Sequence, residues 1–168
     1  LEHRVIKEWH FLRLNVKNVG FGMARNCIAE LRVTGRPQKD HSECPTPARE
    51  PKGLKWAGSA AFATKNIYPR GGEGIVDVLI VDRTLSKENR MNWGTKTDSE
   101  NWGPLEAWAA THDVSMGHPE SRKQDGFCQG RYEIQITVFA ENGAPARKKY
   151  LLTIDEDWEK TEMNLVDP

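Results

Sequence analysis

The tryptophans between residues 83 and 110 are the residues whose type and spacing most directly suggest binding chemistry. They lie among polar residues and glycines, and the tripeptide Asn-Trp-Gly occurs there twice, nine residues apart. Flat indole rings on a loop can stack on sugars, peptides or bases, and asparagines beside them would add polar contacts. The alternative is that the rings fold back and give a long loop a small core of its own. The candidate ligand-binding residues are Asn92, Trp93, Asn101, Trp102 and Trp108.

Complete catalytic motifs are missing from the sequence. It has no Gly-x-Ser-x-Gly elbow for a nucleophilic serine, and the cysteines have no local signature that pairs them with a histidine. The glycine-rich stretch 71–74 precedes a strand pattern and lacks the Lys-Ser/Thr of a phosphate-binding loop. We therefore predict no catalytic residues and no enzyme activity. The weaker alternative is a hydrolase that uses His112 and Asp113 with a distant partner residue.

Two groups of residues could be considered as metal ligands. The densest acidic cluster, at 155–159, supplies oxygen ligands of the kind that calcium prefers, but it lacks the spacing and the loop glycine of an EF-hand. His41 and Cys44 form only half of the set that a structural zinc ion needs. We therefore predict a solvated strand end at 155–159, no metal site and no cofactor.

The chain contains three cysteines, which is an odd number. A secreted domain held together by disulfides has more cysteines, usually in an even number. Cys27 lies in an alternating apolar run, where a small buried hydrophobic residue is expected. Cys44 lies in a proline-rich loop and Cys128 just before a strand, which leaves a bridge between these two open.

The overall composition favours an ordered domain of 168 residues without a bias toward nucleic acid. The 24 basic and 24 acidic residues balance, so no excess of positive charge favours phosphate backbones. No apolar run approaches the roughly 18–20 residues that cross a bilayer. We therefore expect a domain that is soluble by composition, with its compartment undefined. Because the sequence begins with Leu1, a membrane anchor upstream of it stays open.

Period-two alternation predicts strands over much of the chain. Residues 12–17, 27–33 and 132–138 alternate apolar with polar side chains, and 75–81 is apolar enough for a strand that is covered on much of both faces. In the second of these strands Cys27, Ala29, Leu31 and Val33 are expected to face inward. Trp56 is expected in the core.

The segments between these strands are predicted to be loops and turns. Four prolines place residues 35–53 in a surface loop, and a short strand is expected around 53–56. Asn142-Gly143 predicts a hairpin with a tight turn, since both residues tolerate positive φ. The segment 83–110 is predicted to be an inserted, loop-rich region with a helical turn near 104–110. The tail 155–168 is predicted to be a closing helical turn or a frayed end.

These patterns indicate an all-β protein, an antiparallel β-sandwich that comprises residues 1–168 as one domain. The glycines of 18–22 predict a turn between the first two strands. Neither long helical periods nor architectural repeats interrupt the strand pattern.

Four short motifs lie within or beside these strands: Asn18-Val19-Gly20, Ala24-Arg25-Asn26, Leu54-Lys55-Trp56 and Ile67-Tyr68-Pro69. They resemble motifs of immunoglobulin-like accessory modules of bacteria and archaea, of the CARDB kind. The resemblance extends over residues 9–82 and the hairpin at 130–154. The inserted segment 83–110, which we call the Trp-rich loop, departs from it. The resemblance implies an immunoglobulin-like fold and a spacer or binding platform beside a membrane anchor or a larger domain. It implies no catalytic residues.

The sequence thus favours a non-catalytic interaction or accessory module that belongs to a larger or membrane-associated protein. Its partner would be an unknown protein or glycan and not a nucleic acid. The alternative is a carbohydrate- or peptide-binding module that uses the Trp-rich loop.

Overall fold

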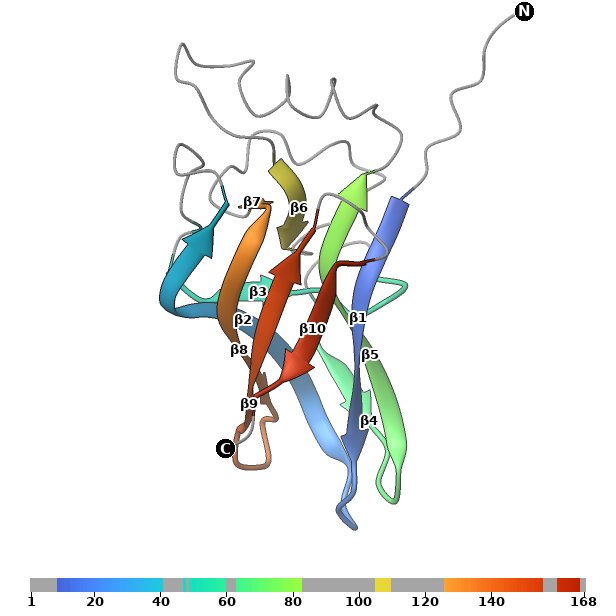
Figure 1. Ribbon diagram of the computed structural model, residues 1–168. Helices are drawn as coiled ribbons and strands as arrows, with labels where there is room; N and C mark the ends of the chain where they lie inside the picture. The colour runs from blue at the N-terminus through green and yellow to red at the C-terminus, as the bar shows by residue number, and fades with distance from the viewer. Residues whose placement is uncertain are drawn as a thin grey trace, which may run out of the picture.

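The protein is described here from a computed structural model, in which residues 9–40, 47, 49–59, 63–82, 105–109, 126–155 and 160–166 are placed. Ten strands and no α-helix form this part of the chain (Figure 1). The strands are β1 (Trp9–Asn18), β2 (Ala24–Lys39), β3 (Lys52–Leu54), β4 (Lys65–Ile67), β5 (Gly72–Asp82), β6 (Leu105–Ala109), β7 (Gly126–Cys128), β8 (Gly130–Phe139), β9 (Ala146–Ile154) and β10 (Glu162–Leu165).

The strands form two antiparallel sheets. One is four-stranded in the order β1-β5-β6-β7, and the other is six-stranded in the order β10-β9-β8-β2-β3, with β4 paired to β2. The predicted all-β antiparallel sandwich is therefore confirmed. The more specific immunoglobulin-like assignment stays a prediction.

The core lies between the sheets and is built by the inward positions of the alternating strands. Cys27, Ala29, Leu31 and Val33 of β2 are all buried, as predicted. On β5, residues 76–80 are buried whereas Ile75 is 41% exposed, so this strand is covered on much of both faces, as predicted. Val76, Val78 and Leu79 join the inward residues of β2 in one hydrophobic cluster, which fixes the face that each sheet turns toward solvent.

Trp56 occupies the centre of this core. It is only 2% exposed, which confirms its predicted burial. Its indole Nε1 donates a hydrogen bond of 3.2 Å to the carbonyl of Cys27, so the polar atom of the ring is satisfied inside the core. An isolated bridge joins Trp56 to Val76 of the opposite sheet's β5, so the segment after β3 closes against the four-stranded sheet.

The predicted surface loop at 35–53 is shorter than expected. β2 continues to Lys39, and β3 already begins at Lys52. The register between β2 and β8 shifts between Thr34 and Gln38, so Pro37 lies at a bulge. A bulge leaves a residue outside the hydrogen-bond ladder, and a proline without an N–H is tolerated there.

The final hairpin forms as predicted, but its turn is not tight. β8 and β9 pair from Gly130↔Ile154 to Val138↔Ala146, which leaves residues 140–145 in the connection. Neither Asn142 nor Gly143 has a positive φ. The Asn142 side chain instead accepts a hydrogen bond from the Arg25 N–H at 2.9 Å and donates one to the Met23 carbonyl at 2.8 Å. The connection is therefore fixed by contacts with the start of β2.

Two predictions near the chain's irregular segments are wrong. Residues 105–109 form strand β6 instead of a helical turn, because pairing with both β5 and β7 supplies their backbone partners. The tail contains strand β10, which pairs with β9, and Met163 packs against the core. Alternation in Glu-Met-Asn-Leu suits an edge strand once a neighbouring strand is available. The rest of 83–110 lies outside the described residues.

The chain passes from one sheet to the other between β7 and β8. Gly130 has a φ of 153°, and a Cβ there would meet the Gln38 carbonyl oxygen at 2.5 Å, so this corner requires glycine. The hydroxyl of Tyr132 donates a 3.0 Å hydrogen bond to the Cys128 carbonyl. A tyrosine bonded to upstream backbone at such a corner is also found in immunoglobulin-like sandwiches.

Cys128 is disulfide-bonded. Cys44, whose pairing with it was left open, lies outside the described residues.

Candidate binding surface

The outer face of the six-stranded sheet presents an ordered array of polar side chains. Because paired residues of an antiparallel sheet project to the same side, the register of β2, β8 and β9 places outward side chains in rows across the strands. The rows are Glu30–Thr137–Arg147 and Arg32–Gln135–Lys149. Charged and hydrogen-bonding groups therefore alternate over this face.

This face is hollowed beside β9 and β10. A groove of about 520 Å³ is lined by Glu133, Gln135, Arg147, Lys148 and Lys149 on its polar side and by Leu165 and Val166 on its apolar side. A second hollow of about 100 Å³ shares Gln135 and Arg147 with it and continues toward β2. The backbone N–H of Val166 donates a 2.9 Å hydrogen bond to the Lys149 carbonyl, which holds the apolar side of the groove against β9.

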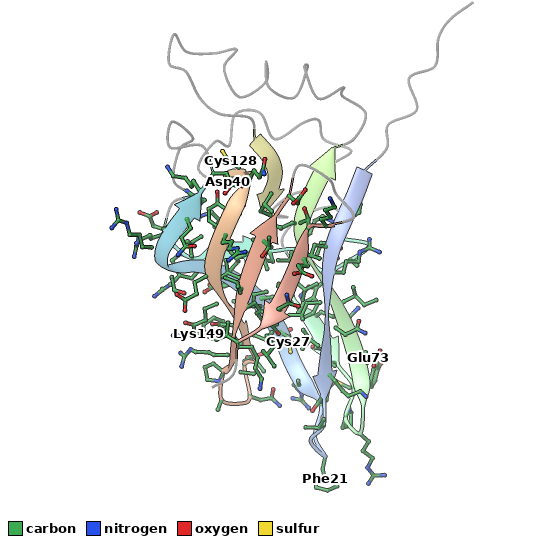
Figure 2. All side chains as sticks on the ribbon, viewed as in Figure 1. Phe21, Cys27, Asp40, Glu73, Cys128 and Lys149 are labelled. Atoms are coloured by element: carbon green, nitrogen blue, oxygen red, sulfur yellow. The ribbon has the colours of Figure 1, made fainter. Side chains whose placement is uncertain are left out.

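The groove carries an excess of positive charge. Four cationic residues line the two hollows, against Glu30 and Glu133 as acids, and three of them project from the outer face, since Lys148 pairs with the core residue Ile136. None of the four takes part in a salt bridge within the described part of the chain. Figure 2 shows Lys149 on the outside of the sheet. The four cations are Arg32, Arg147, Lys148 and Lys149. An anionic group in the groove would meet several of them at once.

A second charged cluster lies between β1, β5 and the segment after β3. The Asp77 carboxylate is fully buried and is bonded by Arg13 Nε and by Lys55 Nζ, each at 2.7 Å. The Lys55 side chain is also buried, whereas that of Arg13 is half exposed. Both cations lie near the face of the Phe11 ring, at 4.9 Å for Arg13 Cζ and 5.6 Å for Lys55 Nζ.

The local strand geometry assembles this cluster. The pairing of β1 with β5 shifts register between Leu12 and Arg13, which sets Arg13 opposite Asp77. On the other side of β5, the Asp77 N–H donates a 3.0 Å hydrogen bond to the Lys55 carbonyl, which brings the lysine alongside. Each carboxylate oxygen faces one cation, so the arrangement neutralises Asp77 instead of offering it to a substrate as a base. Sequence reasoning missed the cluster, and its one signal was a lone aspartate in the apolar run 75–81.

The residues predicted to bind a ligand are largely outside the described part of the chain. This applies to Asn92, Trp93, Asn101 and Trp102, and also to His112 and Asp113 of the hydrolase alternative. The backbone of Trp108 is described: it lies in β6 and pairs with Ile80 and Gly126. Binding by the tryptophans of 83–110 therefore stays a prediction from the sequence.

Three titratable groups in the core have pKa values shifted by burial. The pKa of Tyr132 rises to about 12, and the pKa values of Tyr150 and of the free thiol Cys27 are also raised. Such shifts oppose ionisation, so all three groups stay neutral near pH 7. Among the described residues, no group of three or more His, Cys, Asp or Glu side chains could hold a metal ion.

The comparisons with known proteins add no relative. No protein-family model matches this chain. Neither the curated proteins nor the solved structures include a significant match. The CARDB-like resemblance therefore stays an expectation based on short motifs. The described residues also include no helix long and apolar enough to cross a membrane.

Proposed function

We propose that this chain is a non-catalytic interaction module that binds an acidic segment of a partner protein in the groove between β8, β9 and β10. The observation that carries the proposal is a set of four cations that form no salt bridge with any described residue and that lie beside the apolar side of the groove. Unpaired cations on a sheet face favour a partner of opposite charge through long-range attraction and through charge-assisted hydrogen bonds. The CARDB-like resemblance supports the same class of function, as an accessory part of a larger or membrane-associated protein.

The groove suits an extended peptide. It follows β9 and is bounded on one side by Leu165 and Val166, which are 54% and 37% exposed. Gln135, in the middle of the sheet, offers amide groups to a peptide backbone. An acidic segment with one or two apolar residues would contact all three parts of the surface: the cations, the Gln135 amide and the apolar side formed by Leu165 and Val166.

The experiment is a binding titration followed by fluorescence anisotropy. Three fluorescein-labelled decapeptides of Glu, Asp and Leu, of Lys and Leu, and of Ser and Leu are titrated with the protein at low salt. We expect the acidic peptide alone to bind, with an affinity that falls as the salt concentration rises. Reversing two groove charges, in Arg147→Glu/Lys149→Glu, should weaken binding by about tenfold or more.

A matched control uses a cation on the neighbouring strand, outside the groove. Arg131 is exposed on β8 and pairs with Thr153. Arg131→Glu should change the affinity by about twofold at most, because it acts only through the general field of the protein. Equal binding of the acidic and basic peptides, or an equal loss in Arg131→Glu, would contradict the proposal.

A further inference from the structure

Three large apolar side chains are exposed in the β1–β2 and β4–β5 turns, which lie at the lower end of the ribbon in Figure 1. Val19 and Phe21, in the turn between β1 and β2, are 82% and 88% exposed, and Tyr68, in the turn between β4 and β5, is 68% exposed. Figure 2 shows Phe21 at the extremity of this end, directed away from the body of the protein. We refer to Val19, Phe21 and Tyr68 as the apolar tip.

Hydrogen bonds between the two turns hold the tip in place. The Arg70 N–H donates to the Gly20 carbonyl at 3.0 Å, and the Gly71 N–H donates to the Asn18 carbonyl at 2.8 Å. The Asn18 side-chain amide also donates to the Ile67 carbonyl at 3.0 Å and to the Gly22 carbonyl at 2.9 Å. Because the backbone is already fixed, little conformational entropy remains to be lost when the tip binds something.

The charge available at this end is positive. Arg25 and Arg70 are exposed, and neither forms a salt bridge within the described residues. With Lys17, the cations at this end outnumber its two acids: Glu73 lies 3.9 Å from Lys17, and Glu141 accepts a hydrogen bond from the neutral Asn26 amide. This local excess contrasts with the zero net charge of the whole chain.

We propose that the apolar tip inserts into the interface of an anionic lipid bilayer, with Arg25 and Arg70 beside the lipid phosphates. The exposed area of the three side chains is on the order of 450 Å². That is well below the roughly 800 Å² per partner of a stable protein interface, whereas lipid binding scales with whatever apolar area is inserted. A tyrosine beside a projecting phenylalanine suits the boundary between acyl chains and headgroups, and arginines add attraction to anionic lipid.

The test is co-sedimentation with large unilamellar vesicles, either of pure phosphatidylcholine or of phosphatidylcholine and phosphatidylglycerol at a ratio of about 7:3. The intact chain should bind the anionic vesicles more tightly. Phe21→Ser should lower the partition coefficient by about 50-fold, because on the order of 100 Å² of inserted apolar surface is lost. Arg70→Gln should lower it by about fivefold on anionic vesicles and leave pure phosphatidylcholine unaffected.

The matched control is Leu151→Ser, which removes another exposed apolar side chain, 37% accessible, from the outer face of the six-stranded sheet. It should partition like the parent chain. All the variants change exposed positions, and equal thermal unfolding midpoints would show that they fold alike. Failure of the parent chain to bind anionic vesicles, or binding that Phe21→Ser leaves unchanged, would overturn the proposal. Because the tip and the groove share no residue, this result is independent of the peptide titration.

Discussion

Removal of the Asp77 carboxylate should be among the most destabilising single changes in the described part of the protein. In Asp77→Leu, Lys55 keeps a buried ammonium without the oxygen that lies 2.7 Å from it. Breaking one partner of a buried ion pair costs about 3–5 kcal/mol of unfolding free energy, because the remaining charge stays desolvated. Arg13 contributes less to this loss, since its half-exposed guanidinium can turn toward water.

The double variant Lys55→Met/Asp77→Leu separates this explanation from simple loss of packing. With both buried charges gone, its unfolding free energy should return to within about 1–2 kcal/mol of the parent value, which gives a large favourable coupling in a double-mutant cycle. The assay is equilibrium unfolding in urea, followed by tryptophan fluorescence and circular dichroism. The surface pair Lys17–Glu73, 3.9 Å apart, is the control: its double variant Lys17→Met/Glu73→Leu should change stability by less than about 1 kcal/mol. If the Asp77 double variant is as unstable as Asp77→Leu, the desolvation argument is wrong.

Three further predictions concern the core. Gly74→Ala should lower the free energy of unfolding in urea by about 1–3 kcal/mol, because the new Cβ would lie 2.9 Å from Cζ3 of the buried Trp56 ring. The control Gly143→Ala, whose Cβ would have no atom within 4 Å, should leave the free energy of unfolding unchanged. The unfolding free energy should fall by about 2–3 kcal/mol between pH 10 and 12, because folded Tyr132, with a pKa of about 12, holds a proton that the unfolded chain releases near pH 10. Urea unfolding across this pH range should show a smaller fall for Tyr132→Phe and an unchanged fall for the control Tyr68→Phe. Cys27 should resist iodoacetamide in the folded protein and react fully in urea, as intact mass would show, since it is 1% exposed and its pKa is raised; rapid labelling of the folded protein would contradict this placement.

Local alternation made the strands and their inward faces predictable. The residues of β2 from Cys27 to Val33, and those of β8 from Tyr132 to Val138, carry the period of two that one buried face requires. Alternation does not encode which strand is the neighbour, so the partition of β1 and β2 into different sheets was not foreseen. The same limit explains β6, whose strand conformation depends on β5 and β7.

The candidate surfaces were harder to predict because they depend on contacts between distant parts of the chain. Asp77 is 64 residues from Arg13 and 22 from Lys55, and no periodic pattern links these positions. The groove exists because β10 pairs with β9, although its tail segment had been expected to form a helical turn or a frayed end. The apolar tip could have been suspected from Val19 and Phe21 in a glycine-rich turn, but their exposure follows from the way the β4–β5 turn supports them.

The pairing of β2 with β8 also constrains the order in which the protein can fold during synthesis. At its far end, the Arg25 N–H bonds to the side chain of Asn142, 117 residues later. Ribosomes add about 5–20 residues per second, so the edge of β2 that pairs with β8 lacks its partner for several seconds or more, after β3 and β4 have been made. The antiparallel pair of β1 and β5 is complete much earlier, at Asp82. We therefore expect β1 and β5 to associate on the nascent chain and the six-stranded sheet to close last. The edge of β2 that later receives β8 is then the part that a chaperone would have to shield.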